Sequence, residues 1–180
     1  TPRPGALRTL QVGLEWLPER PGGLNRVYWE LLRHLPAAGV EVTGLVAGSP
    51  SVARQSGGTV TAFAPPWSPL PVRLAALARA GRAAVRSDPA RLVVSHFALH
   101  ALPLLGALDA RPLVVHFQGP WGREGAVEGD ASPISWAKTM VERAVYQRAT
   151  AIIVLSSAFG RILEETFGVP PDRIHVIPGG

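Results

Sequence analysis

Polar side chains and glycines follow three short apolar runs of this sequence, at positions where they could bind a polar ligand. A Gly-Gly pair at 22–23 follows the run at 10–14, and Ser95-His96 ends the run at 92–94. The third cluster, His-Phe-Gln-Gly-Pro-Trp at 116–121, ends the run at 113–115. A lone histidine at a strand end is more often structural than catalytic. Three polar clusters at one edge of one sheet favour a binding site, because a ligand would supply the partners that buried polar atoms need.

The glycine pair lies between a predicted strand and a strongly patterned helix, in which apolar residues repeat at helical spacing over 24–35. Without side chains, Gly22 and Gly23 would let a ligand approach the backbone, where the first N–H groups of the helix favour an anion. Arg26, one turn further, would add a bidentate charge. The alternative is that the glycines only form a tight turn.

The elements that must position these clusters alternate along the chain. Apolar runs predict strands near 10–14, 41–46, 59–63, 91–95, 112–117, 151–155 and 173–177, and helical patterns occupy 24–35, 72–86, 97–108, 133–145 and 156–167. Residues 47–58 and 118–132 are expected to be long loops. Nearly continuous apolar strands are typical of a parallel sheet that helices cover. The sequence therefore predicts a doubly wound, mainly parallel, Rossmann-like α/β domain, in which ligands bind at the carboxyl ends of the strands.

Composition narrows the class of protein. A chain of 180 residues with 47% apolar content can form one domain with a full core. It has no cysteine, which excludes disulfides and thiolate metal sites. The net charge of +5 would suit binding to nucleic acid. The basic residues form no block and no nucleic-acid-binding motif, however, so we expect no nucleic-acid partner. The most apolar stretch, 97–108, is too short to span a bilayer, and we expect a soluble, cytoplasmic protein.

The motifs in their order resemble the N-terminal half of a GT-B glycosyltransferase of family four. The resemblance extends from about Leu10 to Gly180. It is carried by the Gly-Gly-x-x-Arg helix with Ala-Ala-Gly-Val-Glu-Val, then Val-Val-Ser-His-Phe-Ala-Leu-His, Val-Val-His-Phe-Gln-Gly-Pro-Trp, Ile-Ile-Val-Leu-Ser-Ser-Ala-Phe and Asp-Arg-Ile-His-Val-Ile-Pro-Gly-Gly. Such enzymes have two Rossmann-like domains facing a cleft. The resemblance implies that this chain is the half that holds the acceptor.

The resemblance also implies roles for single residues. The loop at 22–23 would lie against the donor diphosphate or the acceptor, and His96 and Trp121 would line the acceptor pocket. The family usually has a histidine, in contact with the transferring sugar, where this chain has Gln118. Glutamine forms hydrogen bonds but carries no proton at neutral pH. His116 shares a strand face with Gln118 and is the alternative residue for that role.

Three further positions complete the expected site. Gly119 follows Gln118 in the same segment, and Glu124 is a candidate contact for an acceptor hydroxyl. Ser156 resembles the family's serine before the hinge between domains, although a simple helix N-cap is the favoured interpretation. Glu15 and Glu19 form no hydrolytic carboxylate pair, and we expect Glu19 to be a solvated surface charge.

In the family, the basic pair and the glutamate pair that bind the donor lie beyond the Val-Ile-Pro-Gly-Gly segment with which this chain ends. We therefore expect residues 1–180 to be a single acceptor-binding domain, inactive alone, with the C-terminal donor-binding domain absent. The complete enzyme would use a nucleotide-diphosphate sugar, retain the anomeric configuration, and need no metal or other cofactor.

Two other classes of protein remain as alternatives. A nucleotide- or dinucleotide-binding Rossmann module needs Gly-x-Gly-x-x-Gly after its first strand, and this chain reads Pro-Gly-Gly-Leu-Asn-Arg there. A non-enzymatic metal-binding domain could use His96 and His100, which are four residues apart, but the local sequence offers no third ligand.

The helix at 72–86 could make a peripheral contact with the inner face of an anionic membrane. Arg79, Arg82 and Arg86 fall on one side of this helix. The apolar surface beside them is expected from Val72, Leu77, Ala84 and Val85. The alternative is a solvated helix face, because alanine anchors poorly and Gly81 weakens the helix.

Overall fold

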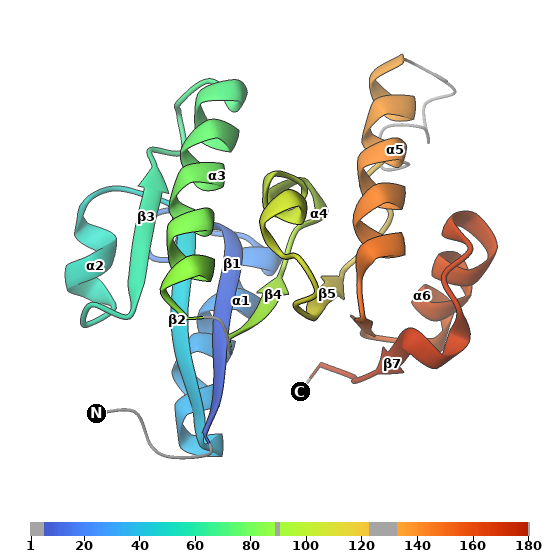
Figure 1. Cartoon of the computed structure of the whole chain (residues 1–180), viewed down its shortest axis with the longest axis horizontal. Helices are drawn as coiled ribbons and strands as arrows, with labels where there is room; N and C mark the ends of the chain where they lie inside the picture. The colour runs from blue at the N-terminus through green and yellow to red at the C-terminus, as the bar shows by residue number, and fades with distance from the viewer. Residues whose placement is uncertain (1–5, 89–90, 123–132, 180) are drawn as a thin grey trace.

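The computed structural model describes residues 6–88, 91–122 and 133–179, in which seven strands form one parallel sheet (Figure 1). The strand order is β3-β2-β1-β4-β5-β6-β7, and every strand pairing in this part of the chain is parallel. The strands are β1 (Leu7–Glu15), β2 (Val40–Ala47), β3 (Val60–Ala64), β4 (Leu92–Ser95), β5 (Leu113–Phe117), β6 (Ala151–Val154) and β7 (Ile174–Val176). The predicted α/β fold with a parallel sheet is confirmed.

Six α-helices connect the described strands: α1 (Gly23–His34), α2 (Ser51–Gln55), α3 (Leu70–Ser87), α4 (Ala98–Ala101), α5 (Pro133–Arg148) and α6 (Ser157–Ile162). Short 3₁₀ segments follow α1 at Leu35–Ala38 and α4 at Leu102–Ala107, and a π-helical turn at Leu163–Phe167 extends α6. None of the helices in the described ranges is long and apolar enough to cross a membrane.

Apolar clusters form on both faces of the sheet. The larger one packs α3, the segment 98–108, α5 and α6 against one face; it includes Leu10, Val12, Leu77, Leu104 and Phe117. The smaller one, formed by Trp16, Tyr28, Val46, Val52 and Val60, packs α1 and α2 against β1–β3 on the other face. Helices on both faces, as predicted, leave the carboxyl ends of the strands open for a site.

Prolines and a small helix account for the differences from the predicted elements. The helix predicted at 97–108 is α4 followed by a 3₁₀ segment, because Pro103 lacks an N–H group and restricts the residue before it. Similarly α1 ends before Pro36, and Gly39 closes the following 3₁₀ turn with a left-handed φ of 81°. The loop predicted at 47–58 was wrong in part, because α2 lies within it and buries Val52.

Candidate functional site

A cavity of about 240 Å³ lies at the carboxyl ends of the central strands. Its walls come from the end of β1, the start of α1, the segments that follow β4 and β5, and one face of α5. The lining residues are Leu14, Leu24, His96, Phe97, Ala98, His116, Gln118, Gly119, Trp121, Glu142 and Tyr146. Complete ligand pockets usually measure roughly 300–1,000 Å³, so this cavity fits only part of a ligand.

Strand register brings the two predicted histidines together. Val94 of β4 is paired with Val114 of β5, so that His96 and His116, each two residues further, project from the same face of the sheet. Their rings are stacked, with centroids 4.5 Å apart and an interplanar angle of 13°. His96 is fully buried, and its Nε2 lies 2.8 Å from Oε1 of Gln11.

Burial makes both histidines poor proton acceptors. Loss of hydration lowers the pKa of His116 to about 4. Burial, and to a lesser extent His116, holds the pKa of His96 well below its usual value. Both rings are therefore neutral at pH 7, and each can donate one hydrogen bond and accept another. The site is built for neutral hydrogen bonding.

Gln118 shares the cavity with His116, as the spacing predicted. Its amide Nε2 is buried and has no hydrogen-bond partner among the described residues. Nδ1 of His96 is in the same condition. Gly119, which follows Gln118, has a φ of 140°, a backbone conformation that residues with a Cβ rarely adopt. Two residues of one cavity wall that each have a buried polar atom without a partner in the described part of the chain point to a ligand at this site.

Trp121 is held from several directions. Its ring meets the Phe97 ring edge to face at 5.1 Å, and the Lys138 ammonium lies 4.8 Å from its centroid. Its backbone N–H donates to Oε1 of Glu142 over 3.0 Å. This ring presents a fixed apolar wall to the cavity.

Glu142 is a site residue that sequence reasoning missed. Its buried carboxylate accepts hydrogen bonds from the backbone N–H groups of Trp121 and Gly122 and from the hydroxyl of Tyr146. These bonds tie the segment after β5 to α5. The sequence signal was spacing: Glu142 precedes the buried Val145 and Tyr146 by three and four residues, which places it on the buried face of the helix.

The glycine loop leaves the start of α1 open. Gly22 is extended, with a φ of 169°, and a Cβ built on Gly23 would meet nothing within 4 Å. Neither glycine has the left-handed φ that only glycine adopts easily. No side chain of the described residues caps α1. Asn25 instead fixes the loop, since it accepts from the backbone of Glu15 and donates to that of Arg20.

Arg26 and Ser156, which were also predicted as site residues, do not line the cavity. Arg26 is exposed on the first turn of α1 and forms no ion pair with the described part of the chain. The Ser156 hydroxyl accepts from the backbone of Phe159, so it caps α6 as the favoured interpretation held. Glu124 lies outside the described residues.

The structure also gives the contacts of Glu19 and of the histidine pair His96 and His100. Glu19 is not merely a solvated charge, because its carboxylate accepts from Ser49 and Ser51. Partial burial opposes ionisation there, but these bonds outweigh it and lower the pKa of Glu19. His96 and His100 bond to different partners: Nδ1 of His100 lies 2.8 Å from the carbonyl oxygen of Gly13. No group of three or more metal-ligating side chains occurs within the described ranges.

Comparison with known proteins gives a family and a fold. The model of Glycosyltransferase Family 4 matches residues 21–180. Sucrose-phosphate synthase of Thermosynechococcus elongatus superposes with a TM-score of 0.76 at 17% identity, over 97% of this chain and 48% of that one. HepE of Anabaena, solved with UDP and glucose, gives 0.66 at 17% identity, over 97% and 44% of the two chains.

Structural likeness alone does not select one reaction. A UDP-N-acetylglucosamine 2-epimerase of Rickettsia bellii also superposes, with a TM-score of 0.59 at 10% identity, over 94% of this chain and 44% of its own length. The chain spans less than half the length of each of these solved structures. No curated protein matches the sequence closely.

Proposed function

The chain belongs to Glycosyltransferase Family 4, and on this premise we propose that the complete protein transfers a sugar from a nucleotide-diphosphate-sugar donor to an acceptor, with retention of the anomeric configuration. We further propose that this chain is the acceptor-binding domain. The acceptor is a glycan, a lipid-linked sugar or a small molecule that offers a hydroxyl group.

One observation carries this proposal: two residues that line the cavity at the strand ends each have a buried polar atom without a partner among the described residues, Nδ1 of His96 and Nε2 of Gln118. One can accept and the other can donate a hydrogen bond, which suits a sugar rich in hydroxyl groups. Trp121 adds an apolar wall on which a ring can pack. Neutral histidines fit this role, because hydroxyl recognition needs no charge.

The start of α1 suits the diphosphate. Breaking a glycosyl bond to a diphosphate builds negative charge on the leaving group, and oriented backbone N–H groups stabilise that charge where it develops. Gly22 and Gly23 leave these N–H groups uncovered, and Leu24 of the same turn lines the cavity. Arg26, exposed on the first turn of α1, can add its charge to the same anion.

The donor site needs more than this chain offers. The cavity is small for a whole ligand, and we propose that a second domain of the complete protein closes over it and binds the nucleotide. HepE, described with UDP and glucose, makes UDP-glucose the first donor to test.

The test is a transfer assay with the complete protein, a panel of nucleotide sugars and a panel of acceptors with free hydroxyl groups. We expect release of nucleoside diphosphate that depends on acceptor, and a product whose anomeric configuration, read by NMR, equals that of the donor. An inverted product contradicts retention. Absence of binding to every nucleotide sugar contradicts the assignment as a whole.

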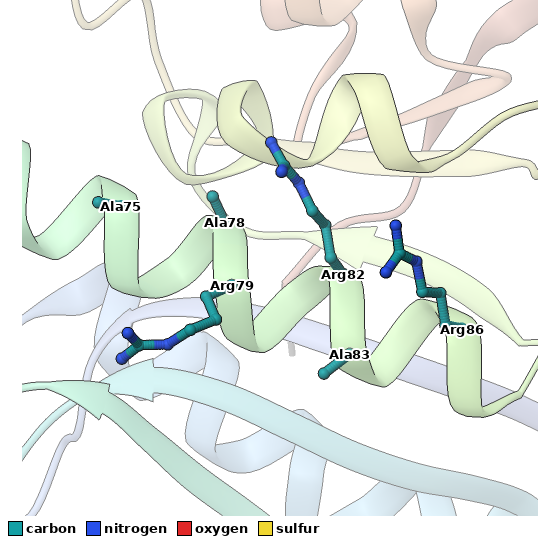
Figure 2. A pocket seen from close by; sticks show the side chains of 6 residues that line it. All are labelled: Ala75, Ala78, Arg79, Arg82, Ala83 and Arg86. Carbon is teal, nitrogen blue, oxygen red and sulfur yellow. The ribbon is translucent and has the colours of Figure 1, made fainter.

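We also propose a peripheral contact between α3 and an anionic membrane. Arg79, Arg82 and Arg86 are exposed and form no ion pair within the described part of the chain. Figure 2 shows them extending from α3 in different directions. Together with Ala75, Ala78 and Ala83 they line a hollow of about 530 Å³. None of these six side chains is buried, so the hollow is a surface feature and no enclosed ligand site.

The apolar part of this surface differs from the sequence prediction. Leu77 and Val85 are buried in the core and cannot contact lipid, and Ala84 is half-buried against the core. Val72 of the predicted residues is exposed, and the exposed apolar side chains lie at the start of the helix. They are Trp67, Leu70 and Val72, which are 77%, 45% and 55% exposed.

A further inference from the structure

A chain of buried hydrogen bonds runs from β2 through β1 to His96. The Thr9 hydroxyl donates to the backbone carbonyl of Glu41 over 3.3 Å, Nε2 of Gln11 donates to the Thr9 hydroxyl over 3.1 Å, and Oε1 of Gln11 lies 2.8 Å from Nε2 of His96. Thr9, Gln11 and His96 are at most 3% exposed. Neither Thr9 nor Gln11 lines the cavity.

The direction of this chain follows from counting protons. A carbonyl only accepts, so the single proton of the Thr9 hydroxyl goes to Glu41. The oxygen of Thr9 must then accept from Gln11, which turns the amide nitrogen toward Thr9 and the amide oxygen toward His96. The reversed amide would make Glu41 and Gln11 compete for one hydroxyl proton, and one buried bond would be lost.

The amide oxygen of Gln11 needs a donor, and the ring nitrogen facing it must therefore carry the proton. In a neutral histidine the other nitrogen is then an acceptor. That nitrogen, Nδ1, is the buried atom of His96 without a partner among the described residues, on a ring that lines the cavity.

We infer that Thr9 and Gln11 are positioning residues that hold His96 in the tautomer protonated at Nε2, so that Nδ1 accepts a hydrogen bond from a hydroxyl group of the acceptor. The inference rests on the proposed function for the identity of the ligand. The site then includes two residues of β1, Thr9 and Gln11, that do not line the cavity.

The first test needs no substrate. In protein labelled with ¹⁵N-histidine, long-range ¹H–¹⁵N spectra distinguish the two tautomers, and we expect His96 to be protonated at Nε2. Thr9→Val keeps a β-branched side chain of the same shape but frees the Gln11 amide to reverse. We expect the spectrum of this variant to show a second tautomer of His96. A wild-type ring protonated at Nδ1, or an unchanged tautomer in Thr9→Val, overturns the inference.

The second test uses the complete enzyme. Gln11→Met, which keeps the length of the side chain and removes its hydrogen bonds, should raise the KM for the acceptor roughly tenfold, equivalent to about 1.4 kcal/mol, and leave the KM for the donor unchanged. Gln147→Met, at an exposed position of α5, is the matched control and should change neither. Gln11→Glu keeps an acceptor opposite Nε2 and should restore the wild-type tautomer.

The two proposals fail in different ways. An unchanged acceptor KM in a folded Gln11→Met enzyme overturns the role of the tautomer in acceptor binding. If Gln11→Met does not fold, Thr9→Val takes its place in the same assay and must raise the acceptor KM. An enzyme that transfers no sugar contradicts the proposed function, while the NMR experiment still decides the tautomer.

Discussion

A substitution of Gln118 should lower activity with little effect on stability. Its amide nitrogen has no partner among the described residues, so Gln118→Ala breaks no hydrogen bond there and should cost about 0.5 kcal/mol of stability or less. If the amide contacts the transferring sugar, the same change should lower kcat/KM at least about tenfold. Thermal unfolding and steady-state kinetics of the complete protein measure the two effects, and Gln118→His should keep activity.

Gln147→Ala is the control for Gln118→Ala, because it should affect stability and not activity. Its amide donates to the carbonyl of Phe167, and neither residue lines the cavity, so its loss should lower the melting temperature and leave kcat/KM unchanged. Equal activity in wild type and Gln118→Ala would remove Gln118 from the site and leave His116 as the candidate for the same role.

At the scale of elements, α3 carries the prediction about membranes. Each arginine near an anionic surface contributes about 1 kcal/mol, so the double variant Arg82→Ala/Arg86→Ala should bind anionic vesicles about 30-fold more weakly. Trp67→Ala should weaken binding as well, because it removes the most exposed large apolar side chain at the start of the helix. Co-sedimentation at low and high salt measures both effects.

The control for α3 removes the same charge elsewhere. Arg54 of α2 and Arg161 of α6 are exposed, and Arg54→Ala/Arg161→Ala should change vesicle binding little. No binding of the wild-type protein at low salt removes the membrane proposal, and an equal loss in both double variants would reduce it to an effect of net charge.

For the molecule as a whole, stability should fall as the pH drops below 6.5. The pKa values of His100 and His116 are lowered to about 4, mainly by burial, so between pH 6.5 and 4 the unfolded chain binds protons that the folded chain does not. The free energy of unfolding therefore rises with pH in this window, and above it the contribution of the two neutral histidines is fully present. At pH 5 each histidine should cost about 2 kcal/mol, or several degrees of melting temperature.

Melting temperatures from pH 8 to pH 5 test this, in a range that lies above the usual titration of carboxyl groups. His116→Gln should flatten the dependence, whereas His175→Gln, at an exposed position on β7, should not. A wild-type protein whose melting temperature is constant down to pH 5 would show that these histidines are not buried in the neutral form.

The chain of 180 residues should fold by itself and catalyse nothing. One apolar cluster packs on each face of the sheet, the smaller one over β1–β3, so cooperative unfolding is expected. It offers the donor chiefly backbone N–H groups, and a nucleotide sugar should bind with a dissociation constant of roughly 1 mM or weaker, about 4 kcal/mol. Isothermal titration and a radiolabel transfer assay measure this. Micromolar affinity, or transfer by this chain alone, would contradict the division into two domains.

The sequence by itself determined the type and order of the elements. Continuous apolar strands such as β6 predicted a parallel sheet covered by helices, and helical periodicity predicted that α1 and α5 are helices. Parallel topology then placed the ends of β1, β4 and β5 at one edge. For that reason His96, His116, Gln118 and Trp121 could be grouped as a site from sequence alone.

Only the tertiary structure decided what each polar side chain bonds to. The partners Gln11 and His96 are separated by 85 residues, and Glu142 and Trp121 by 21. No local pattern reports such contacts, because they depend on strand register and on how α5 packs over the segment after β5. The same holds for α3, where packing took Leu77 and Val85 into the core and left the arginines outside.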